Sequence, residues 1–389
     1  MNNNKLIFNP CTLDLKLCLN DNQIIDINSE YKLNEDLDLF RVNRFRIEIS
    51  LVCNLKCDYC IVFMNNISKP IKLLSLETAK KIVNEFNSTI GNKGDIVLLG
   101  GEPLLNWDVV RYIIKNTEGK NLLFTNALNL TAEKRAFLKE HNVRILTSLD
   151  GYTSTHNQYR FHSSTLKEFE ITCDNIRNAI AEGCDVGIAC LVHNQNVKEL
   201  LPIINFFVNS LNCRSFSFAY SHFLLNETQV SNYPFNQYIE SICELFDYSK
   251  KEKVYIDQTG RLLRGILKKE KCLVSCKAGT SQRTFYPDGT ETICTKLDLI
   301  GKRNIREMLS IFPMNNPQCI DCVALNLCGG GCLWDALKRP NNKGVDERLC
   351  LSKKAIIQYL LDDIQQELKE IDNKEQAKVK IKNLYYPIM

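Results

Sequence analysis

Long hydrophobic runs and runs of like charge are both missing from this chain of 389 residues. The longest apolar stretches, such as Ile96–Leu99, have the length of a strand and are far too short to span a membrane. The formal net charge is only +4, and no lysine or arginine run is long enough to follow a nucleic acid backbone. The first residues contain no apolar segment of the secretory kind. These absences predict a cytoplasmic protein with no membrane partner and no nucleic acid partner.

Cysteine, in contrast, is abundant, with 18 in the chain. Apolar residues make up 44% of the sequence and charged residues 24%, which is an ordinary globular composition. A chain of this length can bury a complete hydrophobic core, so disulfide bonds would add little stability. In a reducing compartment, cysteines in close groups more often bind metal or carry out redox chemistry.

Strand-sized and helical segments alternate through the first two thirds of the chain. Phe45, Ile47 and Ile49 alternate with polar residues, as in a strand with one buried face. Ser75 and Thr131 are suited to cap helices that run to about residues 86 and 140, and Gly183 is suited to end a helix over 166–182. The six predicted strands cover residues 45–51, 96–99, 122–125, 143–148, 186–192 and 216–220.

This alternation predicts an α/β fold with a parallel sheet. Six strands are too few for an eight-fold barrel, so we expect an open six-unit (βα)6 partial TIM barrel with a small cysteine-rich domain. In such barrels the chemistry gathers at the C-terminal ends of the strands.

Changes in composition divide the rest of the chain. We expect an N-terminal appendage with about two strands (1–43), the barrel (44–232), a helical bridge (233–269), the cysteine-rich domain (270–352) and a C-terminal helix and tail (353–389). The last helix is predicted over 355–371. The Lys-rich tail after Asn373 is expected to be loose.

Cys53, Cys57 and Cys60 form a CxxxCxxC triplet on the loop after the first predicted strand. Three thiolates fit three irons of a cubane cluster and leave the fourth iron open, where it can chelate a substrate. A zinc site would more often use four ligands in CxxC pairs. Three cysteines that simply pack in a core are the other alternative.

Gly100, Gly101 and Glu102 directly follow the second predicted strand. Glycines let the backbone approach a ligand closely, and a carboxylate accepts a charge-assisted hydrogen bond from an ammonium group. Taken alone, the same residues would suit a plain turn.

With Tyr59 before its last cysteine, the triplet resembles the signature of the radical SAM superfamily, and Leu99–Pro103 is similar to the GGEP motif of that family. The resemblance implies a [4Fe-4S] cluster on the triplet, whose free iron binds the amino and carboxylate groups of S-adenosyl-L-methionine, with Glu102 holding the amino group. It further implies that an electron, from a small donor such as flavodoxin or ferredoxin, cleaves this cofactor. The resulting 5′-deoxyadenosyl radical then abstracts a substrate hydrogen.

A third stretch, Thr147–Gly151, resembles the S-[IL]-D-G sequence of the peptide-modifying branch of this family. Ser148 and Asp150 belong to it, and Ser148 is implied to bond the ribose or carboxylate of the cofactor. A surface loop of solvated polar residues is the alternative.

The family continues this stretch with H-D-x-x-R, and His156, Asn157 and Arg160 match it except that Asn157 replaces the usual aspartate. Arg160 is implied to pair with the cofactor carboxylate. Asn126 is a further cofactor contact by resemblance to the T-N-G stretch of the family, although Ala127 replaces the glycine.

The cysteines beyond residue 270 resemble the seven-cysteine SPASM domain, and Cys272 supplies an eighth thiolate. Eight thiolates suffice for two fully ligated clusters, which would bring the total to three [4Fe-4S] clusters. The resemblance implies one ligand set of Cys272, Cys276, Cys294 and Cys332, and a second of Cys319, Cys322, Cys328 and Cys350. A pair of zinc ribbons is the alternative. Backbone N–H groups of Gly329–Gly331 are placed to bond cluster sulfurs.

Seven further cysteines stand singly, and we expect them to be packing residues. They are Cys11, Cys18, Cys173, Cys184, Cys190, Cys213 and Cys243.

Two saturated clusters suit an electron relay, which indicates net oxidation of the substrate. The family resemblance implies a peptide or protein substrate. The leading hypothesis is an oxidoreductase-type enzyme that forms a thioether or carbon–carbon crosslink in a ribosomally made precursor peptide. An anaerobic sulfatase maturase is the runner-up, although that family usually has an aspartate where Thr295 stands, and a threonine hydroxyl is too weak an acid to replace it. A peptide epimerase and a non-catalytic iron–sulfur carrier or scaffold are further alternatives.

The sequence does not identify a catalytic base. Tyr220 and His222 follow the last predicted strand and are the candidates, with packing or solvation as the alternative for both. Residues 1–43 are a candidate guide for a leader peptide by strand addition.

Overall fold

The computed structural model describes residues 4–20, 23–33, 38–62, 70–160, 167–221, 230, 232–298, 313–338 and 345–389. The chain divides into two compact units. The barrel unit consists of Leu39–Tyr233 and Lys277–Arg303. The terminal unit consists of Met1–Asp38, Pro234–Cys276 and Asn304–Met389. Among the described residues, no helix is both long and apolar enough to cross a membrane.

A parallel sheet forms the centre of the barrel unit, and it contains all six predicted strands. Their order is β9-β8-β7-β6-β5-β4, and each neighbouring pair is parallel. The strands are β4 (Arg44–Ser50), β5 (Asp95–Gly100), β6 (Lys120–Thr125), β7 (Arg144–Ser148), β8 (Asp185–Val192) and β9 (Ser215–Tyr220). The partial-barrel α/β fold is therefore confirmed.

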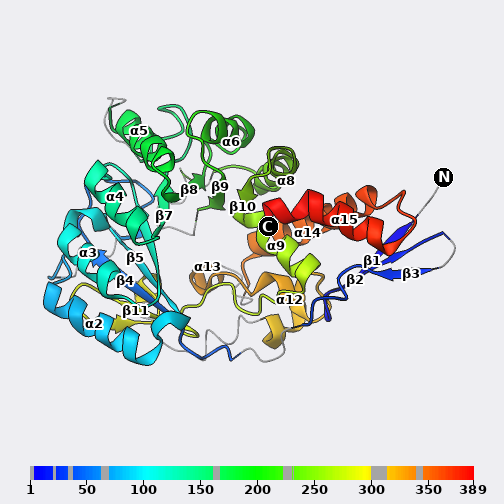
Figure 1. Ribbon diagram of the computed structural model, residues 1–389, viewed down its shortest axis with the longest axis horizontal. Helices are drawn as coiled ribbons and strands as arrows, with labels where there is room; N and C mark the ends of the chain where they lie inside the picture. Colours follow the sequence, from blue (N-terminus) through cyan, green and yellow to red (C-terminus); the bar gives the residue numbers. More distant parts are fainter. Residues whose placement is uncertain are drawn as a thin grey trace. The chain divides into compact units, whose positions relative to one another are not determined.

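Helices lie along the outer side of this sheet (Figure 1). Ser75 accepts a hydrogen bond from the backbone N–H of Thr78 and caps the first helix, as predicted. Thr131 caps a later helix in the same way, and Gly183 has φ +86° just after the end of another. These helices are α2 (Leu76–Thr89), α3 (Trp107–Asn116), α4 (Ala132–Glu140), α5 (Lys167–Ala181) and α6 (Leu200–Asn209). The barrel unit also contains the short helix α10 (Thr295–Asp298).

Strand β4 shows how the sequence divides the two faces of the sheet. Phe45, Ile47 and Ile49 are completely buried, and the Phe45 ring packs edge-on against Phe86 of α2 at 5.3 Å. The alternate residues, including Glu48 and Ser50, point to the opposite face because successive side chains of a strand alternate. Glu48 and Ser50 are therefore polar groups on the face turned away from the helices.

Strand β11 (Gln282–Phe285) extends the sheet on the other side of β4 and was not predicted. It pairs parallel with β4, so that Phe285 lies opposite Ile47, and β12 (Glu291–Thr292) pairs antiparallel with it. A four-residue strand is too short for its alternation to stand out in a sequence. Residues 282–292 therefore join the sheet of the barrel unit.

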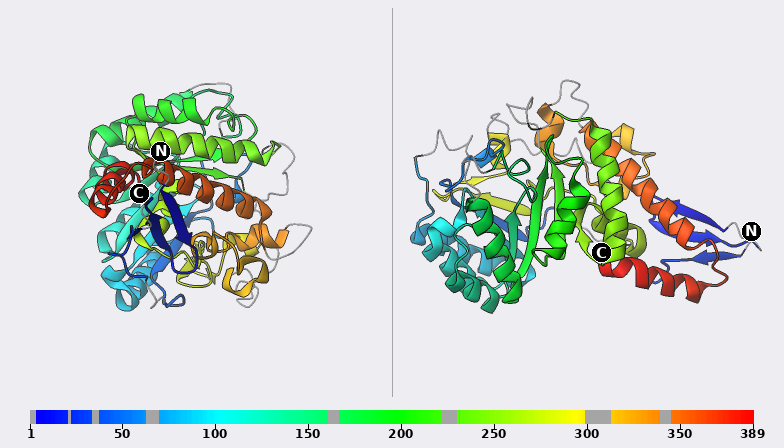
Figure 2. Two further views of the ribbon diagram at one scale, coloured as in Figure 1. Left: turned by 90° about the vertical axis from the view of Figure 1, so that its right-hand side faces the viewer. Right: turned by 90° about the horizontal axis from the view of Figure 1, so that it is seen from above.

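The terminal unit combines a small sheet with helices (Figure 2). The antiparallel strands β1 (Lys5–Asn9), β2 (Asp14–Cys18) and β3 (Ile24–Asp26) form one more strand than the two expected. The segment predicted as a helical bridge is helical. The helices are α8 (Phe235–Glu252), α9 (Asp257–Lys268), α12 (Leu325–Cys328), α13 (Leu333–Lys338), α14 (Glu347–Glu367) and α15 (Lys374–Tyr385).

The expectation of a loose tail after Asn373 is wrong. Asn373 caps α15 by accepting a hydrogen bond from the backbone N–H of Gln376 at 3.0 Å. Ala377, Ile381 and Tyr385 recur every four residues and are buried, which is the spacing of one helical face. The Tyr385 hydroxyl also donates to Asp363 of α14 at 2.6 Å. The many lysines of the segment hide this weak periodicity in the sequence.

We expect Ile381→Ala to lower the free energy of unfolding of the terminal unit by about 2–4 kcal/mol, because it leaves a cavity under α15. Val379→Ala removes a side chain that is 50% exposed and is expected to change it by about 0.5 kcal/mol or less. Hydrogen exchange of the amides of residues 374–385 measures both. Fast exchange of these amides in the wild-type chain would show that the tail is loose after all.

Candidate active site

Cys53, Cys57 and Cys60 lie on the loop that leaves the C-terminal end of β4, and all three are half-buried. Burial raises the pKa of Cys57 to about 12 and also raises the pKa of Cys53, and the charge of Cys60 adds to both increases. The backbone N–H of Leu55 already points at Cys53 Sγ, 3.3 Å away. A thiol with a raised pKa loses its proton when it binds a metal ion, because the positive charge of the metal stabilises the thiolate. The donor set therefore fits a cluster held by three cysteines.

The backbone of Gly100 and Gly101 lies against the end of β4. A Cβ atom on Gly100 would be 2.2 Å from the carbonyl oxygen of Ser50, and one on Gly101 would be 2.3 Å from that of Val52. The N–H of Gly101 donates to Ser50 O at 2.6 Å, and the N–H of Glu102 donates to Val52 O at 2.9 Å. Any larger residue would push the strands apart, so the glycines bring Glu102 beside the triplet loop.

Glu102 is completely buried, and its carboxylate is held by three donors. One oxygen accepts from the Leu104 N–H at 2.9 Å and the Thr125 hydroxyl at 2.8 Å, and the other from the Asn126 N–H at 2.8 Å. Burial raises the pKa of Glu102, and these hydrogen bonds oppose the rise. A fixed buried carboxylate of this kind is well suited to receive an ammonium group.

Asn126 connects the end of β6 to the triplet loop. Its side-chain amide donates to Asn54 Oδ1 at 2.7 Å and lies 3.7 Å from Cys53 Sγ. Ala127 adopts φ +62°, a conformation that glycine reaches at less cost. The residue that departs from the T-N-G pattern thus keeps the backbone turn.

The buried residues Asp150 and Arg160 form one network with the half-buried Tyr59. The guanidinium of Arg160 contacts both oxygens of Asp150 at 3.3 Å, and the Tyr59 hydroxyl donates to the same carboxylate. The Arg160 guanidinium also lies 5.6 Å from the centroid of the Tyr59 ring and 4.0 Å from Cys57 Sγ. The network fastens the triplet loop to the segment after β7. A direct contact of these residues with the cofactor stays a prediction.

Asn157 has a structural role that an aspartate could not fill. Its side-chain oxygen accepts from the Asp150 N–H at 3.1 Å, while its amide nitrogen donates to the Gly151 carbonyl at 3.1 Å. A carboxylate only accepts, so only the amide satisfies both partners. Ser148 is half-buried at the C-terminal end of β7.

Tyr220, the first of the two candidate bases, is half-buried and is the last residue of β9. His222 lies outside the described residues. The catalytic role of both residues stays a prediction.

Glu48 is a potential functional residue that the sequence analysis missed. It is 2% exposed, and its Oε2 atom has no hydrogen-bond partner among the described residues. Burial raises its pKa. The β4–β11 register continues from Phe285 to place Tyr286 beside it, and the Tyr286 hydroxyl donates to Asp298 at 2.9 Å. The sequence did contain a signal for Glu48, namely a carboxylate at an inward-facing position of a strand that is otherwise buried.

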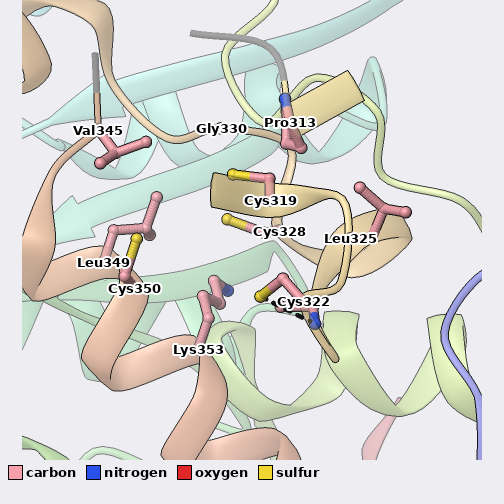
Figure 3. Close-up of a pocket in the computed structure, with 11 residues that line it drawn as sticks. Pro313, Cys319, Cys322, Leu325, Cys328, Gly330, Val345, Leu349, Cys350 and Lys353 are labelled. Atoms are coloured by element: carbon pink, nitrogen blue, oxygen red, sulfur yellow. Dashed lines mark hydrogen bonds between the residues drawn. The ribbon is translucent and has the colours of Figure 1, made fainter. Parts of the chain in front are cut away.

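Four cysteines of the terminal unit line one pocket (Figure 3). We call this the four-cysteine pocket, and its remaining lining includes Pro313, Leu325, Val345, Leu349 and Lys353. The four are the members of the second predicted ligand set, Cys319, Cys322, Cys328 and Cys350. No three or more His, Cys, Asp or Glu side chains in the described parts of the chain are gathered so as to hold a single ion.

The thiols of the four-cysteine pocket are close enough to influence one another. Burial raises the pKa of Cys350, and the charges of Cys319 and Cys322 add to the rise. Burial likewise raises the pKa of Cys328 to about 12. Backbone N–H groups already point at two of the sulfurs, from Ala324 to Cys322 at 3.5 Å and from Gly330 to Cys328. As in the triplet, this donor set fits an iron–sulfur cluster.

Gly329, Gly330 and Gly331 all have positive φ, at 65°, 75° and 79°. A Cβ atom on Gly329 would be 2.3 Å from the Ser275 backbone nitrogen and 2.8 Å from Cys272 Sγ. The glycines therefore allow the segment around Cys272 to pack against the segment after Cys328.

Three cysteines of the other predicted ligand set, Cys272, Cys276 and Cys332, belong to the terminal unit, whereas Cys294 belongs to the barrel unit. Their grouping stays a prediction. Among the cysteines expected to pack, Cys173, Cys190 and Cys213 are buried and Cys18, Cys184 and Cys243 are half-buried. Cys11 is exposed, which contradicts the packing expectation for that residue.

A parallel half-barrel with a cysteine triplet after its first strand and a buried glutamate after its second defines a class of enzyme. Residues 47–207 match the model of the radical SAM superfamily. The chain therefore contains a radical SAM domain.

Several known proteins are similar to this chain. The radical SAM cyclopropyl synthase TigE of Paramaledivibacter caminithermalis is 20% identical over 83% of this chain and 74% of its own length. A cysteine-type anaerobic sulfatase-maturating enzyme of Clostridium novyi is 26% identical over 40% of this chain, which spans 45% of that enzyme. The solved structure of native anSMEcpe with bound AdoMet and Cp18Cys peptide shares the fold, with a TM-score of 0.65 and 20% identity over 84% of this chain and 99% of the other.

We expect Glu102→Gln to weaken binding of S-adenosyl-L-methionine by about 10- to 100-fold, because the variant loses the carboxylate charge. The new amide would also face three backbone and hydroxyl donors. Anaerobic calorimetry measures the affinity, with Glu133→Gln, an exposed residue of α4, as the control. Equal affinity of wild type and Glu102→Gln would remove Glu102 from the binding site.

Proposed function

We propose that the protein is a radical S-adenosyl-L-methionine maturase that oxidatively crosslinks a ribosomally made precursor peptide, through a thioether or a carbon–carbon bond. The observation that carries the proposal is the four-cysteine pocket. A second thiol site has no use in radical generation, but it suits an enzyme whose substrate must also lose an electron. The peptide bound in the anSMEcpe structure supports a peptide substrate.

The residues that would hold the cofactors follow from the site. Cys53, Cys57 and Cys60 would hold the radical-generating cluster, and Glu102 would receive the amino group of S-adenosyl-L-methionine. The eight C-terminal cysteines would hold two further [4Fe-4S] clusters. When bound, these groups supply the 5′-deoxyadenosyl radical and a path for one electron. A small electron donor such as flavodoxin or ferredoxin and a cytoplasmic location belong to the same proposal.

Within this proposal Glu48 is the proton acceptor. In thioether formation a carbon–hydrogen and a sulfur–hydrogen bond break and a carbon–sulfur bond forms. One hydrogen leaves as an atom, the other as a proton, and one electron goes to an iron–sulfur centre. Glu48 supports the assignment because its carboxylate is buried and its raised pKa lies nearer the working pH than that of an exposed carboxylate.

Sulfatase maturation is the second candidate. The shorter match to the Clostridium novyi enzyme favours it, while the absence of an aspartate after Cys294 opposes it.

The first experiment tests the product directly. The anaerobically reconstituted full chain is incubated with S-adenosyl-L-methionine, a reductant and a cysteine-containing peptide encoded beside its gene, and the peptide is analysed by mass spectrometry. We expect the loss of two hydrogens, no aldehyde and a thiol that no longer alkylates. Cys57→Ala serves as the control, since it lacks a triplet ligand and is expected to make no product.

Other outcomes decide between the alternatives. Aldehyde on a sulfatase-derived peptide, with no change in the encoded peptide, would promote sulfatase maturation. Unchanged mass with uptake of solvent deuterium would indicate epimerisation. Absence of both product and 5′-deoxyadenosine would overturn the assignment as an enzyme and favour a carrier.

Glu48→Gln tests the proton acceptor. We expect crosslinking to fall by about 100-fold or more while 5′-deoxyadenosine still forms, because hydrogen abstraction does not need the carboxylate. The wild-type crosslinking rate should rise with pH as Glu48 ionises, with its midpoint above the ordinary carboxyl range, and the variant should lack this rise. Glu77→Gln, which removes an exposed carboxylate, is the control. An unchanged pH profile in Glu48→Gln would contradict the role.

A further inference from the structure

Lys353 is the only charged residue among the described residues that line the four-cysteine pocket. It follows Cys350 by three positions in α14, so both side chains lie on the same side of the helix. Figure 3 shows both extending from that helix toward the pocket. The rest of the lining consists of the cysteines, a glycine and apolar residues, so no other charged side chain lines the pocket with Lys353.

The Lys353 ammonium lies within electrostatic reach of two cysteines. Burial raises the pKa of Cys328, and Lys353 opposes that rise more than any other group. The same order of causes holds for Cys272, a member of the other predicted ligand set. The neighbouring Lys354 also opposes the rise in pKa at Cys319 and Cys350, but it is exposed, so water and salt screen its charge more strongly.

A cation in this position changes the energy of electron transfer. A cluster with four thiolate ligands carries net negative charge, and reduction adds one more negative charge. A nearby positive charge stabilises the reduced form more than the oxidised form, and does so more strongly where solvent is excluded. A charged side chain lining a cluster pocket therefore acts on the reduction potential.

We propose that Lys353 raises the reduction potential of the centre held by Cys319, Cys322, Cys328 and Cys350, so that this centre accepts the electron released during peptide oxidation. The inference rests on the proposed function, which assigns an iron–sulfur cluster to this pocket. Lys353 is a positioning residue in this role, because it acts on the substrate only through the cluster.

The test measures potentials on the full chain. Cys53, Cys57 and Cys60 are replaced by alanine, so that only C-terminal clusters contribute to the signal. Lys353→Met is then compared with its parent by anaerobic redox titration followed by electron paramagnetic resonance, with iron content measured on the same samples. We expect one of the two C-terminal centres to become harder to reduce by about tenfold in its equilibrium constant, which is ~59 mV for one electron.

Three matched variants keep the result interpretable. Lys353→Arg retains the charge and should titrate close to the parent, and Lys251→Met removes an exposed lysine of α8 and should leave both potentials unchanged. Lys353→Gln is a second neutral variant for the case that methionine prevents cluster loading. If both neutral variants lose iron while Lys353→Arg retains it, the charge serves loading rather than potential, and the proposal is overturned.

The remaining outcomes separate this inference from the proposed function. Iron-loaded Lys353→Met with unchanged potentials would overturn the role of Lys353 and leave the clusters in place. A parent protein without iron at the C-terminal cysteines would overturn the cluster assignment and this inference with it.

Discussion

The close approach of the Gly100–Gly101 backbone to the end of β4 is the contact on which the barrel site depends. Two backbone hydrogen bonds join these strand ends, and no side chain fits between them. The same contact fixes where Glu102 enters the unit, and Glu102 in turn orders the start of the loop after β6 through Thr125 and Asn126. The glycines are thus needed for the architecture before any cofactor binds.

The three buried carboxyl groups of the barrel site differ in how their burial is compensated. Asp150 and Arg160 neutralise each other and hold the triplet loop in place. Glu102 is not paired in this way, but three donors compensate its burial. Glu48 has neither a partner for Oε2 among the described residues nor exposure to water. A buried carboxyl group with an unpartnered oxygen is costly, which is why it points to a function rather than to stability.

The sequence predicted most of the fold, but not the side-chain contacts within the candidate site. The six strands and the caps at Ser75 and Thr131 follow from local periodicity and capping chemistry, which act over a few residues. The pairing of β11 with β4 was missed because it joins segments more than 200 residues apart through a very short strand. The helix after Asn373 was missed because three buried residues stand among many lysines.

In the candidate site, too, the sequence predicts where residues lie along the chain but not which side chains they contact. The motifs place Glu102, Asn126 and the triplet correctly on strand ends, since in a parallel sheet these ends meet at one edge. That Arg160 pairs with Asp150, or that Asn157 must both accept and donate, depends on side-chain geometry that no spacing reveals. Lys353 was missed for the same reason, since a lysine in an amphipathic helix is normally solvated.

The central claim is that the triplet and the C-terminal cysteines hold separate iron–sulfur clusters, and counting iron tests it most directly. Anaerobically reconstituted wild-type chain should hold about 12 irons, and Cys57→Ala and Cys322→Ala should each lose roughly four of them independently. Mössbauer spectra of the same samples should show only [4Fe-4S] signals. About four irons in the wild-type chain, with no loss in Cys322→Ala, would contradict the account.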